Sequence, residues 1–102
     1  MEKSVKMSML LEIYKNMLTD RQADIIDFYY NQNLSLSEIG DEFSISRQAV
    51  RKSLVEAEKN LTVLEEKLEI LKKQSERNEK IDRILKQIKE ENIAKMIEEL
   101  RG

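Results

Sequence analysis

The fold is decided by residues 35–54, which read SLSEIGDEFSISRQAVRKSL. Ser35 and Ser46 each stand directly before a segment with helical periodicity, where a short hydroxyl side chain can cap the first turn of a helix. Glu38 follows Ser35 by three positions, so the first of the two segments also has the pattern of a capping box. The stretch therefore predicts a short helix over residues 36–43 and a second helix that begins after Ser46.

The residues between these two segments fit a tight turn. Gly40 lies where two steeply crossing backbones would approach each other, and a larger side chain there would hold the helices apart. Ser44 occupies a turn position that usually adopts the left-handed conformation, which costs a residue other than glycine about 1 kcal/mol. Five apolar residues can converge beneath the turn as its core: Ile39, Phe43, Ile45, Val50 and Leu54. Together these features predict a helix-turn-helix.

The exposed residues at the start of the second helix have side chains that suit DNA. In a helix-turn-helix, the first turns of this helix face the edges of the bases. Arginine can bind guanine through two hydrogen bonds, glutamine can pair with adenine, and lysine or arginine can neutralise phosphate. We therefore predict a DNA-binding surface that consists of Ser46, Arg47, Gln48, Arg51 and Lys52. The alternatives are a solvated helix face, or a contact with protein or RNA.

The sequence before residue 35 predicts two further helices. Between residues 3 and 17, apolar residues recur every four positions, at Val5, Met9, Ile13 and Met17, and Leu10 and Tyr14 widen this stripe. Thr19 and Gln22 form another capping-box pattern, so a second helix is expected to begin after Thr19 and to end near Asn31. With the helix-turn-helix, these segments predict a four-helix unit of the all-α class.

The helix that begins after Ser46 carries a leucine-rich stripe that continues well beyond the helix-turn-helix. Its apolar positions alternate spacings of four and three, which is the heptad pattern of a coiled coil. If this helix runs from residue 46 to residue 73, it is about 40 Å long. We expect a homodimer through this seam, as is usual for helix-turn-helix proteins that bind two half-sites. The alternative is that the first or the last helix of the same chain covers the stripe. The seam consists of Leu54, Leu61, Leu64, Leu68 and Leu71.

A bend is expected where the heptad pattern fails. The next seam positions would be Ser75, Asn78 and Asp82, so we predict a bend or loop at residues 74–78. A last helix over residues 79–100 then carries two groups of large apolar residues, the second partly rotated from the first. The groups are Ile81, Ile84, Leu85 and Ile88, then Ile93, Met96, Ile97 and Leu100. The expected organisation is a helix-turn-helix domain over residues 1–73 and a C-terminal helical segment over residues 74–102.

The composition of the 102 residues favours helices and a binding function. The sequence has no proline, only two glycines and 37% charged residues, which is typical of long helices. It contains neither cysteine nor histidine, so thiolate metal sites and the commonest general base are excluded; we expect no enzyme, metal or cofactor. No apolar stretch is long enough to cross a membrane, and a cytoplasmic protein is expected. Since the net charge is −2, any surface for nucleic acid must be local.

Several separate motifs resemble a known family, in the same order along the chain. They are Leu18-Thr19-Asp20-Arg21-Gln22, Phe28-Tyr29-Tyr30, Leu34-Ser35-Leu36-Ser37-Glu38-Ile39-Gly40 and Ile45-Ser46-Arg47-Gln48-Ala49-Val50. These residues resemble the DNA-binding C-terminal region of bacterial sigma factors and, more closely, the YlxM family of small Gram-positive proteins. The resemblance extends from Lys6-Met7-Ser8 to Glu65-Glu66-Lys67-Leu68, and the segment after Leu71 is variable in the family.

The resemblance implies a helix-turn-helix regulator associated with the signal recognition particle pathway. By analogy with sigma factors, Arg47, Gln48, Arg51 and Lys52 match the positions that face the promoter. The family often has Tyr-Asp where this chain has Arg51-Lys52, and the more basic pair favours a nucleic acid as the ligand. The alternative function is an accessory protein that binds protein or RNA of the particle instead of DNA.

Overall fold

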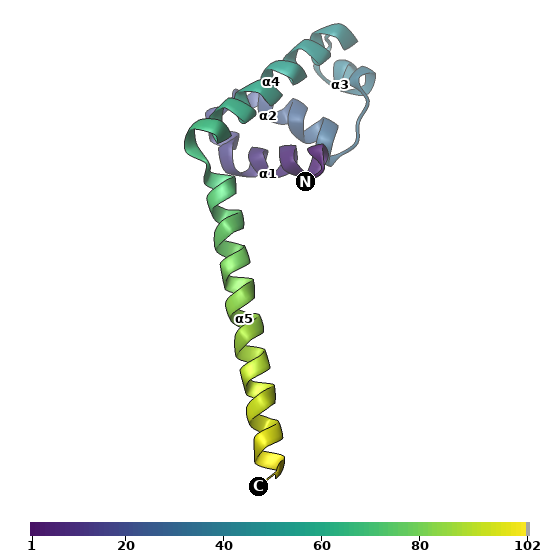
Figure 1. Ribbon diagram of the computed structural model, residues 1–102. Helices are drawn as coiled ribbons and strands as arrows, with labels where there is room; N and C mark the ends of the chain where they lie inside the picture. Colours follow the sequence, from purple (N-terminus) through teal and green to yellow (C-terminus); the bar gives the residue numbers. More distant parts are fainter. Residues whose placement is uncertain (102) are drawn as a thin grey trace. The chain divides into compact units, whose positions relative to one another are not determined.

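The computed structural model describes residues 1–101, and in this range every regular element is helical (Figure 1). The predicted all-α class is therefore confirmed. The elements are α1 (Lys3–Tyr14), the 3-10 turn η1 (Lys15–Met17), α2 (Asp20–Ile26), the π-helical turn η2 (Asp27–Asn31), α3 (Leu36–Phe43), α4 (Arg47–Leu68) and α5 (Ile70–Arg101). The chain divides into one compact unit over Met1–Leu71 and a second that begins at Lys72. Gly102, the end of the predicted C-terminal segment, lies outside the described residues.

Helix α4 is the central element of the first unit. It packs against α1, α2 and α3, and Figure 1 shows α3 beside the beginning of α4. The core draws residues from all of these helices, and α5 contributes its second residue. The buried residues are Met7, Leu10, Leu11, Tyr14, Ala23, Ile25, Ile26, Ile39, Val50, Leu54, Ala57, Leu61 and Leu71.

The three predicted helix caps are present. The hydroxyl of Thr19 accepts a hydrogen bond from the Gln22 amide at 3.1 Å, and the Gln22 side chain accepts one from the Thr19 amide. Ser35 and Glu38 form the same reciprocal pair, and the hydrogen bond from the Ser35 amide lowers the pKa of the Glu38 carboxyl. Each cap gives a partner to an amide that the helix itself leaves free. The starts of α2 and α3 are therefore confirmed, as is that of α4 at Ser46.

The apolar stripe predicted for the first helix was right at Leu10 and Tyr14, which are buried, and in part at Ile13, and it was wrong at Val5, Met9 and Met17. Val5 is 44% exposed and Met17 is 60% exposed, whereas the buried residues of α1 are Met7, Leu10, Leu11 and Tyr14. A spacing of four advances about 40° further than one helical turn, so a stripe with this spacing winds away from a flat core. The buried set mixes spacings of three, one and three, which keeps it on one side of the helix.

The predicted bend at residues 74–78 was also wrong. These residues lie within α5, and the long helix instead ends at Leu68, where Glu69 adopts the left-handed conformation with φ 51°. A polar network stabilises this break. The Glu65 carboxylate accepts hydrogen bonds from the Tyr14 hydroxyl at 2.8 Å and from the Leu71 amide at 3.0 Å, and the Tyr14 oxygen accepts one from the Ile70 amide. The first amides of α5 thus find partners in α1 and α4.

The leucine stripe of α4 is covered within one chain. Leu54 and Leu61 are 6% and 0% exposed, and Leu71 lies in the same core after the break. Leu64 packs partly buried against this core, and Leu68 is 41% exposed. The prediction of a coiled-coil seam is corrected accordingly, since a pairing through Leu54 and Leu61 would require the core to open. The stripe is interrupted at Glu69, because α4 ends at Leu68.

Candidate nucleic-acid interface

The turn between α3 and α4 is as tight as the sequence predicts. A Cβ atom added to Gly40 would lie 2.7 Å from the backbone oxygen of Ile45, which is closer than two such atoms can approach. The Ile45 amide donates to the Gly40 oxygen at 2.9 Å and the Ser44 amide donates to the Asp41 oxygen at 3.4 Å. Ser44 is left-handed, with φ 56° and ψ 42°. These are the hydrogen bonds of a Schellman motif, and they set the path of the chain from α3 into α4.

Apolar contacts beneath the turn hold α4 in place. Ile39 and Val50 are fully buried, and Leu54 is 6% exposed. Phe43 is partly buried; its ring centroid lies 5.7 Å from that of Phe28, and the guanidinium carbon of Arg21 lies 4.6 Å from the ring centroid. Ile45 packs against the same core. The start of α4 is therefore anchored on its inner side, and its outer side is free to meet a ligand.

The predicted surface residues lie together at the start of α4. The Ser46 hydroxyl accepts a hydrogen bond from the Ala49 amide at 3.0 Å, so Ser46 caps the helix. The four side chains that follow in the predicted set are all exposed: Arg47, Gln48, Arg51 and Lys52. A hollow of about 470 Å³ is lined by Leu36, Ser46, Arg47, Gln48 and Arg51. A neighbouring hollow of about 410 Å³ is lined by Gln48, Arg51, Lys52, Val55 and Glu56.

Three residues that line these hollows were not among the predicted ones. Leu36 reaches the surface from the first turn of α3, and Val55 is 55% exposed although it is apolar. Val55 and Glu56 follow Arg51 and Lys52 by four positions, so helical spacing could have extended the surface to them. Leu36 had no such signal, because its place beside α4 depends on the crossing of the two helices.

The electrostatics of the surface favour an anion. The first turn of α4 contains no acidic residue, and the free amides of a helix start carry partial positive charge. Arg47, Arg51 and Lys52 add three full positive charges, and Glu56 is the first acidic side chain of α4. The first two turns of α4 therefore form a basic face that could neutralise phosphate, with Gln48 placed to form hydrogen bonds.

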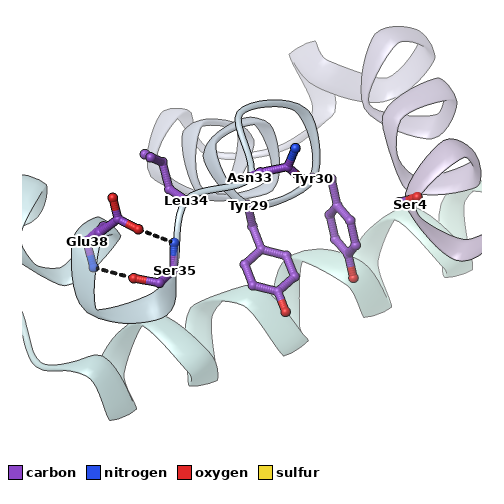
Figure 2. Close-up of a pocket in the computed structure, with 7 residues that line it drawn as sticks. All are labelled: Ser4, Tyr29, Tyr30, Asn33, Leu34, Ser35 and Glu38. Atoms are coloured by element: carbon purple, nitrogen blue, oxygen red, sulfur yellow. Dashed lines mark hydrogen bonds between the residues drawn. The ribbon is translucent and has the colours of Figure 1, made fainter.

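A third hollow, of about 430 Å³, lies elsewhere in the first unit (Figure 2). The Tyr30 hydroxyl in its lining donates a hydrogen bond to Glu58, which also forms an ion pair with Lys3 at 3.3 Å. Burial, followed by the hydrogen bond to Glu58, raises the pKa of Tyr30. Ser35 and Glu38 in the same lining form the cap of α3. These polar groups already stabilise the fold, so the basic face of α4 is the better candidate for a site. The lining residues are Ser4, Tyr29, Tyr30, Asn33, Leu34, Ser35 and Glu38.

Comparison with known proteins assigns the chain to a family. Residues 1–100 match the family UPF0122, described as "Putative helix-turn-helix protein, YlxM / p13 like", which is not a description of an enzyme. The chain is 41% identical over 85 residues to the UPF0122 protein YofM of Lactococcus lactis, covering 83% of this chain and 77% of the relative. It is 40% identical over 101 residues to a UPF0122 protein of Mycoplasma capricolum, covering 98% and 89%. It is 36% identical over 91 residues to a UPF0122 protein of Listeria innocua, covering 89% and 83%.

These relatives agree with the resemblance drawn from the sequence motifs. In residues 1–101, no helix is both long enough and apolar enough to span a membrane. The match covers α1 to α4 completely and almost all of α5. The chain belongs to the UPF0122 family of YlxM/p13-like helix-turn-helix proteins.

Proposed function

We propose that this chain is a regulatory protein that binds double-stranded DNA through the start of α4. The observation that carries the proposal is the basic face of α4, directly after a tight helix-turn-helix turn. Arg47, Arg51 and Lys52 are exposed on that face, and Gln48 lies among them. Arginine and glutamine can form paired hydrogen bonds with guanine and adenine in the major groove, and lysine can neutralise phosphate.

The inner anchoring of α4 supports this role. Base recognition requires a helix whose orientation is rigid, because hydrogen bonds to base edges depend on direction. Gly40 and the buried residues Ile39 and Val50 supply this rigidity from the opposite side of the helix. The basic side chains need no change of fold to reach a groove. A binding role without catalysis is consistent with a sequence that lacks histidine and cysteine.

Structured RNA is the second candidate ligand, since Arg47, Arg51 and Lys52 could also neutralise the phosphates of RNA. The family resemblance makes the RNA of the signal recognition particle the relevant probe, and a link to that pathway is part of this alternative. The structure offers DNA the closer fit, because an α-helix enters the major groove of B-form DNA, whereas that of A-form RNA is too narrow.

The test is fluorescence anisotropy with labelled duplex DNA of random sequence and with signal recognition particle RNA, over a salt series. The double variant Arg47→Ala/Arg51→Ala should weaken binding to the duplex and reduce the slope of log K against log salt by about 2. The matched control is Lys59→Ala/Lys67→Ala, which removes two exposed charges from later turns of α4 and should bind duplex DNA nearly as the natural chain does. Equal loss in both variants, or tight binding to the RNA alone, would refute the proposal.

A further inference from the structure

Val55 is an exposed apolar residue within the basic face of α4. It is 55% exposed, more than any other large apolar residue of α4, whereas its neighbour Leu54 is buried in the core. The side chain of Val55 therefore adds little to the packing of the fold. Valine is also a weaker helix former than lysine or glutamine, so the helix itself gains nothing from it. What distinguishes Val55 is its place on the surface.

The side chains around Val55 are polar or charged. Val55 is the apolar member of the set that lines the hollow of about 410 Å³, together with Gln48, Arg51, Lys52 and Glu56. Gln48 precedes Val55 by seven positions and Arg51 precedes it by four, so these side chains lie on one side of the helix. A ligand in this hollow would meet hydrogen-bond donors and an apolar contact side by side.

The major-groove edge of an A·T base pair presents a matching combination. Adenine offers the acceptor N7 and the donor N6, and thymine offers the acceptor O4 and an apolar C5-methyl group. Gln48 can form paired hydrogen bonds with adenine, and an apolar side chain such as that of Val55 can contact the methyl group. The two side chains therefore favour A·T pairs through two separate interactions.

The spacing along α4 allows both contacts in one groove. Seven residues of an α-helix span about 10.5 Å, and stacked bases are about 3.4 Å apart, so Gln48 and Val55 would reach bases up to about three pairs apart. Glu56 follows Val55, and its carboxylate would be repelled by phosphates but can accept a hydrogen bond from the amino group of cytosine. This part of the face therefore fits base edges better than the DNA backbone.

We propose that Val55 is a specificity-determining residue that contacts the C5-methyl group of a thymine in the major groove. The inference rests on the proposed binding of duplex DNA through the start of α4 and adds the chemical group that is recognised. Arg51 and Lys52 can neutralise phosphates whatever the sequence, whereas the preference for thymine depends on Val55. Duplex binding and thymine recognition can therefore be tested apart.

Replacement of thymine by uracil tests the contact, because uracil pairs with adenine in the same way and lacks only the methyl group. Duplexes bound by the natural chain are selected from a random pool. The tightest is then synthesised with uracil in place of one thymine at a time. At the contacted position, loss of the methyl group should raise the dissociation constant about fourfold in fluorescence anisotropy, and uracil elsewhere should have no effect.

The variant Val55→Ala assigns the methyl contact to its residue. In this variant the same uracil replacement should have almost no further effect, because the side chain that meets the methyl group is already gone. The matched control is Val5→Ala, the same change at a position of α1 that is 44% exposed and outside the basic face. This control should keep the fourfold response to uracil.

The outcomes separate this inference from the proposed function. If the natural chain binds the selected duplex but tolerates uracil at every position, the inference is overturned and DNA binding stands. A fourfold response that persists in Val55→Ala would overturn it as well, since another residue, such as Leu36 in the neighbouring hollow, would then contact the methyl group. If no duplex is bound at all, the proposed function fails and the inference fails with it.

Discussion

At the scale of the residue, the turn between α3 and α4 depends on Gly40. We predict that Gly40→Ala lowers the free energy of unfolding by about 1–3 kcal/mol, because its Cβ atom would lie 2.7 Å from the Ile45 oxygen and would force the backbones apart. Urea denaturation measures the change. Ser37→Ala, at an exposed position of the same helix, is the control and should change stability by less than about 0.5 kcal/mol. An equally stable Gly40→Ala variant would show that the close approach is not needed.

Ser44 is strained in the same turn, because a side chain disfavours the left-handed conformation. With φ 56°, Ser44→Gly should raise the free energy of unfolding by about 1 kcal/mol. Glu42→Gly, two residues earlier and within α3, should have the opposite effect of about 1 kcal/mol, since glycine disfavours a helix interior. If both variants are destabilised alike, strain at Ser44 makes no contribution to stability.

At the scale of the element, the break between α4 and α5 depends on Glu65. Replacement by alanine should cost about 1–3 kcal/mol, because the Tyr14 hydroxyl is buried and would lose its acceptor, and the Leu71 amide would lose its cap. Thermal or urea denaturation measures the loss. Glu66→Ala, at the exposed neighbouring position, is the control. A Glu65→Ala variant as stable as this control would mean that the packing of Leu71 alone holds the break.

The same junction predicts a dependence on alkaline pH. Burial and the hydrogen bond to Glu65 raise the pKa of Tyr14 above its ordinary value of 10.0 in the folded chain. Below pH 10 the hydroxyl keeps its proton in both states, so its contribution is fully present. Above pH 10 the unfolded chain loses this proton first, and the free energy of unfolding falls. Tyr14→Phe should therefore show a shallower decrease between pH 9 and pH 11 than the natural chain in urea titrations, and parallel curves would contradict this.

The starts of the helices could be predicted from the sequence, whereas the break between α4 and α5 at Glu69 could not. A cap such as Ser46 or Ser35 bonds an amide three residues away, so its signal is local. The break at Glu69 depends on Tyr14, which lies 51 residues before Glu65 and meets it only in the folded chain. Residues 74–78 have polar residues at the next heptad positions, Ser75 and Asn78, which suggested a bend there. The heptad pattern of α4 is lost at these positions, but the chain remains helical through them as part of α5.

The candidate site could be predicted from the sequence only in part. Arg47, Gln48, Arg51 and Lys52 follow from the turn and its cap, since they occupy fixed positions after Ser46. The hollows beside them could not be foreseen, because Leu36 comes to the start of α4 through the crossing of α3 and α4. The polar side chains of the surface could therefore be predicted from their spacing after Ser46. The contribution of Leu36 could not be predicted without the arrangement of α3 and α4.

At the scale of the whole molecule, DNA binding is assigned to the first unit alone. The buried core of this unit positions the basic face of α4, and the exposed apolar side chains of α5 lie in the second unit. Ile84→Glu/Ile97→Glu should therefore bind a short DNA duplex as the natural chain does, as measured by fluorescence anisotropy. Loss of duplex binding in this variant would show that α5 contributes to the DNA-binding surface.

The most direct test of the central claim is a titration of the isotope-labelled chain with duplex DNA, followed by amide chemical shifts. We predict that the largest chemical-shift changes fall on residues 46–56, which comprise Ser46 and the first turns of α4, with smaller changes at the start of α3 beside Leu36. Changes confined to α1 or α5, or no change at duplex concentrations that saturate helix-turn-helix proteins, would contradict it.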